Sequence, residues 1–272
     1  MSQPAKAGSP GTLSVIHGRI AQLQNSPTEV DAKSRRIYET VLRESRRMDG
    51  GNFRVIETDD LIRIYRLYDA EYFEGACETL IRDVHRTALT FRLSPRMTSA
   101  GGKTTRTKRF EPTPTGRITT IDYEIAISTL LLFQTFLDPS QPALVCGLTC
   151  RDRLDALLRI FEHELIHLLE MLVWGESSCS ASNFQSLAYR IFGHQGVVHE
   201  LITPQVRAAK EFTLKVGDHV RFEHEGKTYR GILNRITRRA SVLVPGVGGI
   251  VYSDGHSYLK YYVPLESLVK DE

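Results

Sequence analysis

The feature that most restricts the fold of this chain is the sequence HELIH at residues 163–167, inside the apolar run RLDALLRIFEHELIHLLEMLVWG. Apolar residues recur in this run at helical spacing, so it predicts one long helix from about Cys150 to Trp174. Thr149 and Asp152 are the expected capping box at its start. Two histidines and several glutamates within so apolar a helix require a chemical partner.

The spacing of HELIH suits a metal ion. Residues four apart on a helix lie on one face, about 5 to 6 Å apart, so His163 and His167 can present two ring nitrogens to one ion. Glu164 projects beside them, where it can take a proton from a metal-bound water. Two histidines on a solvated face are the competing interpretation, which the apolar flanks disfavour. The helix therefore predicts a Zn²⁺ site with Glu164 as the catalytic base.

A third zinc ligand must come from elsewhere, because catalytic zinc normally takes three protein ligands and one water. If a helix over Phe184–Phe192 packs antiparallel to the HELIH helix, the loop GHQGVVHE returns to the level of the histidines. This arrangement favours His194 or His199. A loop that folds back directly after Trp174 favours Cys179 instead. The downstream candidates are Glu170, Glu176, Cys179, His194 and His199.

Composition limits the class of protein. A chain of 272 residues with 41% hydrophobic and 25% charged residues is typical of globular proteins, with one large or two smaller domains. It shows no apolar stretch of membrane-spanning length and no signal peptide, so we expect a cytoplasmic protein without a membrane partner. Four cysteines without export predict reduced thiols. A net charge of +3 does not by itself indicate nucleic acid.

The segments before HELIH predict an α+β domain. Residues 1–12 are rich in Pro and Gly and predict a disordered tail, and residues 13–57 predict a helical, mainly solvated segment. Two helices broken near Gly75 follow, then Thr- and Ile-rich runs that indicate a small antiparallel sheet. We expect residues 58–203 to form one domain around the sheet and the HELIH helix.

The C-terminal segment has a different pattern of apolar and polar residues. After an expected linker near Thr203–Glu211, residues 212–272 alternate apolar and polar side chains in short runs, which predicts about five strands in a small all-β barrel. Tyrosines accompany its arginines and suit nucleic-acid binding. The competing interpretation is that the tyrosines fill a small core and the arginines form an ordinary solvated face. Protein binding is an equal rival to nucleic-acid binding. The candidate nucleic-acid residues are Arg230, Arg235, Arg238 and Arg239.

The order of the motifs YDAEYFEGACETL, LTFRLSPRMTSAGGKTT, EIAIST and FEHELIHLL resembles the SprT-like metallopeptidase domain, the family of the Spartan protease of DNA–protein crosslink repair. The likeness covers roughly residues 58–200. It implies a zincin-like fold and a zinc-dependent endopeptidase, with His163 and His167 as ligands and Glu164 as general base. The C-terminal barrel resembles SH3-like or Tudor-like domains.

One motif departs from the family pattern. Family members place a His-Gly pair before a Phe or Trp at the start of the next helix, whereas this chain has SSCSASNF, with Ser180 at the histidine position. Cys179, His194 or His199 must then substitute. Two hypotheses follow: a zinc metallopeptidase acting on proteins bound or crosslinked to DNA, and a non-catalytic, zinc-stabilised module that binds DNA or protein. A structural zinc would have four protein ligands, and a catalytic zinc would keep one position open.

Overall fold

The computed structural model describes residues 10–113, 116–138 and 142–271. The chain divides between Leu201 and Ile202 into two compact units, and the predicted mixture of helices and strands is confirmed. No helix within the described ranges is long and apolar enough to cross a membrane. Most of the predicted tail over residues 1–12 lies outside the described residues, although Pro10 already begins the first helix.

Two helices open the first unit, α1 (Pro10–Gln22) and α2 (Pro27–Glu44). Helix α2 begins with a capping box, in which Ser26 Oγ accepts from Glu29 N and the Glu29 carboxylate accepts from Ser26 N. The outer faces of both helices are solvated, as expected from their charges. Their inner faces belong to the main core and bury Ile16, Ile20, Ile37 and Val41.

The predicted break near Gly75 is confirmed. Helix α3 (Thr58–Phe73) stops where Glu74 and Gly75 take positive φ values of 51° and 78°. The chain then continues as the short helix α4 (Ala76–Thr79) and the π-helix η1 (Leu80–His85). Left-handed backbone at this position ends one helix and redirects the next.

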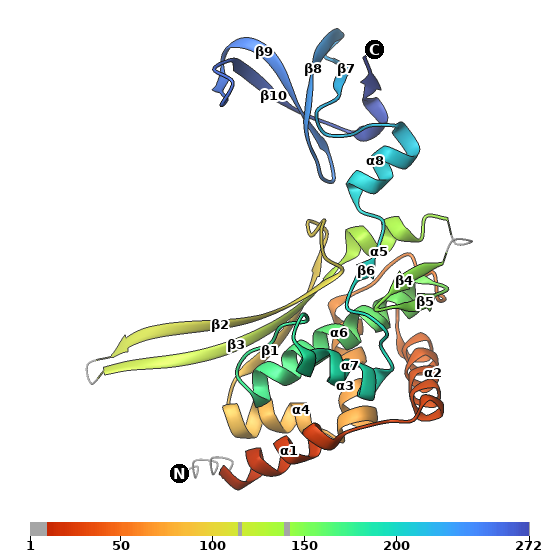
Figure 1. Ribbon diagram of the computed structural model, residues 1–272, viewed down its shortest axis with the longest axis vertical. Coiled ribbons are helices and arrows are strands. Elements are labelled where there is room, and N and C mark those ends of the chain that lie inside the picture. Colours follow the sequence, from red (N-terminus) through yellow and green to blue (C-terminus); the bar gives the residue numbers. More distant parts are fainter. Residues whose placement is uncertain (1–9, 114–115, 139–141, 272) are drawn as a thin grey trace. The chain divides into compact units, whose positions relative to one another are not determined.

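A three-stranded sheet follows in the order β1-β3-β2, formed by β1 (Ala88–Ser94), β2 (Gly102–Thr113) and β3 (Gly116–Ser128). Strands β2 and β3 are antiparallel, but β1 pairs with β3 in parallel, so the prediction of a wholly antiparallel sheet was wrong. The strand with the longest buried run, over residues 125–128, takes the central position. The outer halves of β2 and β3 project beyond the helices as a two-stranded ribbon (Figure 1).

The predicted HELIH helix is confirmed as α6 (Arg153–Val173). Asp152 caps it by accepting from Asp155 N at 2.9 Å, so the expected Thr149–Asp152 capping box was wrong. The helix over Phe184–Phe192 is confirmed as α7 (Ser182–Phe192), closed by Gly193. The remaining elements of this unit are α5 (Thr129–Thr135), β4 (Ala143–Val145), β5 (Leu148–Cys150) and β6 (His199–Glu200).

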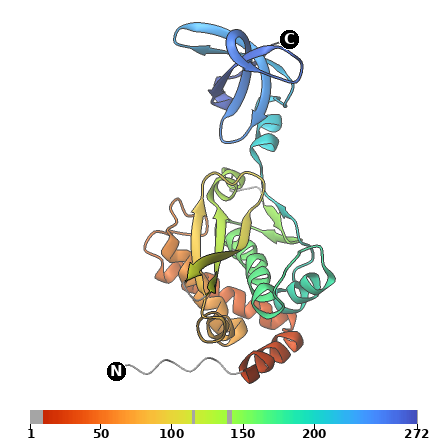
Figure 2. The ribbon, with the colours of Figure 1, turned by 90° about the vertical axis from the view of Figure 1, so that its left-hand side faces the viewer.

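The second unit is an antiparallel sheet in the order β10-β9-β8-β7-β11, curved around its own apolar core (Figure 2). The expected linker is instead helix α8 (Pro204–Phe212), because Thr203 accepts from Val206 N and Ala208 packs into the core. The other elements are β7 (His219–His224), β8 (Lys227–Ile236), β9 (Ala240–Val251), β10 (Ser257–Val263), η2 (Leu265–Ser267) and β11 (Val269–Lys270). The predicted five strands are confirmed.

Candidate metal centre

Helix α6 places its two histidines one turn apart in a buried environment. The ring centroids of His163 and His167 are 4.9 Å apart. Phe184 of α7 packs against both rings, at centroid distances of 4.8 Å and 4.5 Å. The apolar ring restricts the motion of both imidazoles without occupying their nitrogens.

His199 reaches the same place from the end of the loop that follows α7. Strand β6 pairs with β4 so that His199 lies opposite Val145, and its ring centroid is 4.7 Å from that of His163. Its Nε2 atom is buried and has no hydrogen-bond partner among the described residues. Buried polar atoms of this kind are rare, and a nitrogen without a partner is free to bind an ion.

The turn between β4 and β5 positions this loop. Cys146 O accepts from Gln195 N at 2.9 Å and from Gly196 N at 3.0 Å. Gly147 has φ +76°, and a Cβ there would lie 2.9 Å from the Gln195 carbonyl carbon. Only glycine allows both this backbone conformation and this approach. The turn therefore fixes where His199 enters the centre.

Two groups of side chains bring their potential ligand atoms within 4.8 Å of one another among the described residues. One group is Cys146, His163 and His199, and the other is His163, His167 and Cys179. His163 belongs to both. Groups that could hold a metal ion are therefore present. Cys179 is grouped with both HELIH histidines, whereas His199 is grouped with His163 and Cys146.

A hydrogen-bond chain selects the tautomer of His167. Ser177 Oγ donates to Glu170 Oε2 at 2.5 Å, and it lies 2.7 Å from His167 Nδ1. The single hydroxyl proton goes to the carboxylate, so Nδ1–H of His167 donates to Ser177 and Nε2 keeps its lone pair. Asn183 donates to the other Glu170 oxygen at 2.6 Å. Outer hydrogen bonds of this type orient metal ligands in proteins.

Glu164 is buried beside the histidines and held against strand β2. Thr104 Oγ1 lies 2.8 Å from Glu164 Oε2 and 2.9 Å from its backbone oxygen. A Cβ on Gly102 would lie 2.6 Å from Glu164 Cγ, so the strand approaches this carboxylate closely. Burial raises the pKa of Glu164 to about 7, while the bonds from Thr104 lower it. A carboxylate with this pKa suits proton transfer near neutral pH.

The three histidines of the centre are held in the neutral form that binds metal. Burial lowers the pKa of His163 to about 2, helped by the charges of neighbouring histidines. Burial likewise lowers the pKa of His167 and of His199 to about 4. Neutral imidazoles are the required state for ligation.

His194, also predicted as a ligand, lies outside both groups. Its Nε2 donates to the buried Glu162 Oε2 at 2.8 Å, and Tyr68 and the partly buried Arg159 also donate to Glu162. Burial alone would raise the pKa of Glu162, but Arg159, the His194 bond and the Tyr68 bond outweigh it and lower the pKa. His194 thus anchors the loop that carries His199.

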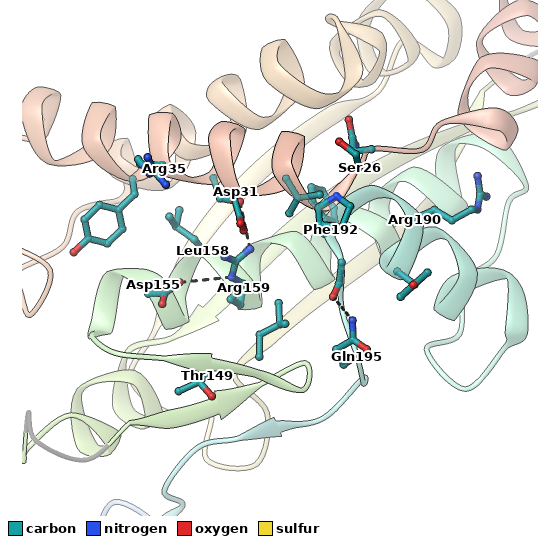
Figure 3. Close-up of a pocket in the computed structure, with 18 of the residues that line it drawn as sticks. Ser26, Asp31, Arg35, Thr149, Asp155, Leu158, Arg159, Arg190, Phe192 and Gln195 are labelled. Atoms are coloured by element: carbon teal, nitrogen blue, oxygen red, sulfur yellow. Dashed lines mark hydrogen bonds and ion pairs between the residues drawn. The ribbon is translucent and has the colours of Figure 1, made fainter.

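A cavity of about 970 Å³ opens beside the N-terminal turns of α6, between α2, α7 and the β4–β5 turn. Figure 3 shows Asp155 and Arg159 of α6 at this cavity, with their side chains 3.6 Å apart. Arg159 also belongs to the Glu162 network. Asp155 and Arg159 are thus paired with each other, and the HELIH residues do not line the cavity.

Three of the four predicted nucleic-acid residues of the second unit lie at one turn, and the fourth forms an ion pair. Arg230 lies 3.3 Å from Asp271, whereas Arg235, Arg238 and Arg239 are exposed around the β8–β9 turn. The tyrosines expected to stack on bases are largely used in packing: Tyr229 and Tyr261, with centroids 4.9 Å apart, lie against the core of this unit.

Comparisons of this chain with known protein families, known proteins and solved structures give no match. The geometry of the centre therefore carries the functional argument. Sequence reasoning missed Cys146, Thr104 and Ser177. Only Thr104 had a signal in the sequence, since it follows the Gly101-Gly102 pair that allows close packing.

Proposed function

We propose that this protein is a zinc-dependent endopeptidase of the SprT-like type. The unpaired, buried Nε2 of His199 beside the HELIH histidines is the observation that carries the proposal. The proposed ligands are His163 and His167 of the HELIH helix, with His199, whose ring lies beside that of His163, as the third. Cys179, which is grouped with both HELIH histidines, is the alternative third ligand. When bound, zinc would polarise a peptide carbonyl and lower the pKa of a water molecule.

The chain's own residues supply the remaining chemistry. Glu164 would accept the proton of the attacking water and deliver it to the leaving amine, as its raised pKa allows. Thr104 orients that carboxylate through its hydroxyl. Glu170, through Ser177, keeps His167 in the tautomer that leaves Nε2 available. Each of these roles supports hydrolysis of a peptide bond.

The proposed substrates are proteins, including those bound or crosslinked to DNA. This extension rests on the SprT-like resemblance and on the basic residues of the chain.

A non-catalytic, zinc-stabilised module is the second candidate, because His163 belongs to both groups and further possible ligands therefore lie near it. If His163, His167, His199 and Cys179 all ligated one ion, no position would remain for water. The zinc would then hold α6, β6 and the loop before α7 together.

Metal content and proteolysis of the purified protein test the proposal. We expect one zinc per chain, cleavage of casein or of the chain itself, and loss of cleavage with retained zinc in Glu164→Gln. His199→Ala should reduce zinc occupancy more than Cys179→Ala, with Cys150→Ala as a buried thiol outside both groups. Zinc without cleavage under any condition would favour the structural module, and a protein without zinc affinity would contradict both.

A further inference from the structure

The projecting part of the β2–β3 ribbon has two faces of different charge. Cross-strand partners share a face, and the register pairs Lys108 with Ile121, Phe110 with Thr119 and Pro112 with Arg117. Because side chains alternate, Arg106, Lys108, Phe110 and Arg117 lie on one side. We call these four residues the basic face. Thr104, which contacts Glu164, begins the same side of β2.

The opposite side is mixed and internally neutralised. Asp122 and Glu124 are paired across from Thr107 and Thr105, so they lie away from the basic face. Asp122 makes an ion pair with Arg109 at 3.4 Å, and Glu124 makes one with Arg92 at 2.9 Å. Among side chains that the structure describes, the acidic residues of the ribbon are thus all on this side.

The cations of the basic face are available to a partner. Arg106 donates to Gly175 O at the end of α6, but neither Lys108 nor Arg117 forms an ion pair with any described residue. Phe110 is 55% exposed, and the Arg117 guanidinium lies 5.1 Å from its ring centroid. Among the described residues, Phe110 is thus an exposed ring beside two cations that form no ion pair.

We propose that the basic face binds single-stranded nucleic acid, with Lys108 and Arg117 contacting phosphates and Phe110 stacking on a base. Alternating phosphates and flat bases match both kinds of group, whereas an acidic peptide matches only the cations. A duplex would keep its bases stacked internally and leave Phe110 without a partner. A narrow ribbon with a stacking residue near its end therefore fits an unpaired strand best.

The position of the basic face connects it to the metal centre. Strand β2 starts at Gly102 against Glu164 and runs outward, so Phe110 lies about 20 Å from Thr104 at roughly 3.4 Å per residue. A protein attached to a strand held here would be within reach of the centre. Access of the metal centre to such an attached protein matters only if the proposed function is correct. Binding of the single strand to the basic face does not depend on the proposed function.

Fluorescence anisotropy of labelled single strands with the full chain tests the proposal. The Glu164→Gln protein is used throughout, so that binding is measured independently of cleavage. Phe110→Ala should weaken binding by about 5- to 100-fold. The double variant Lys108→Gln/Arg117→Gln should reduce the slope of log affinity against log salt by about 1.4, or about 0.7 per phosphate contact.

Arg109→Gln is the matched control, because it removes the same charge from the opposite side of the same strand. It should leave the salt dependence unchanged. The proposal is wrong if Arg109→Gln has the same effect as Lys108→Gln, or if binding is lost in Arg235→Gln/Arg238→Gln/Arg239→Gln and kept in the ribbon variants. Tighter binding of duplex, or equal competition by polyglutamate, would also overturn it.

Single-stranded DNA and RNA are tested side by side. Binding of either nucleic acid through the basic face supports the proposal. The nucleic acid that binds more tightly is identified as the natural ligand. A protein that binds strands but never cleaves would keep this inference and lose the proposed function. A protein that cleaves without binding strands would do the reverse.

Discussion

Ser177 Oγ lies 2.7 Å from His167 Nδ1 and donates a hydrogen bond to Glu170 Oε2. Ser177→Ala would remove this bond and free the imidazole to adopt the other tautomer. We expect zinc affinity to fall by about 10- to 100-fold, the usual effect of removing an outer partner of a metal ligand. Competition with a chelator measures it. Ser178→Ala is the control, since that exposed hydroxyl is hydrogen-bonded to Ser180 and not to a residue of the metal centre. Equal affinities in both variants would contradict the role of Ser177.

Gly102→Ala should disturb Glu164 while leaving the metal ligands in place. The added methyl group would lie 2.6 Å from Glu164 Cγ, so the carboxylate must move. A displacement of about 1 Å at a reacting group can reduce turnover about 100-fold. Casein cleavage at matched zinc content tests this expectation. Gly50→Ala is the control, because a methyl group added there would meet no atom within 4 Å. Unchanged cleavage in Gly102→Ala would contradict the role of the Glu164 carboxylate in proton transfer.

Glu162→Gln should destabilise the first unit strongly. The fully buried carboxylate pairs with Arg159 and accepts from His194 and Tyr68. Its loss breaks a buried ion pair, leaves Asp155 as the ion-pair partner of Arg159 and turns an amide N–H toward these donors. The free energy of unfolding should fall by about 3 to 5 kcal/mol. Denaturant titration measures it. Glu124→Gln, which breaks the exposed ion pair to Arg92, should cost less than about 1 kcal/mol.

The metal-free protein should lose stability as pH falls. The pKa values of His163, His167 and His199 are lowered by burial, to about 2, 4 and 4. Below the unfolded value of about 6.5 the unfolded chain binds more protons at these positions, so their contribution is complete above pH 6.5 and declines toward pH 4. Thermal unfolding across this range, with a chelator present, measures the loss.

The titration of Glu164 opposes the loss of stability on acidification over nearly the same pH range. Burial raises its pKa to about 7, so the folded state binds the extra proton and stability falls as pH rises from about 4.5 to 7. Three histidines outweigh one carboxylate, which sets the sign of the net effect. Glu164→Gln should therefore steepen the loss of stability on acidification, and a flatter profile in this variant would contradict the assignment.

The parts of this structure that sequence could predict depend on local spacing. Helix α6, the pairing of His163 with His167, and the break at Gly75 follow from residues within one or two turns of each other. The position of β1 beside β3 and the approach of Thr104 to Glu164 depend on contacts across many residues. His199 was one of several equal candidates because β6 has only two residues, too few for a periodic signal.

That short strand also determines how the centre can open. His199 and Glu200 are the only β6 residues paired with β4, whereas His163 and His167 belong to a helix of 21 residues. Segments held by few backbone pairings open far more often than long helices. One imidazole can thus leave while the other two stay fixed. Amide hydrogens of His199 and Glu200 should exchange with solvent before those of α6, and an ion held by all three rings would slow that exchange selectively.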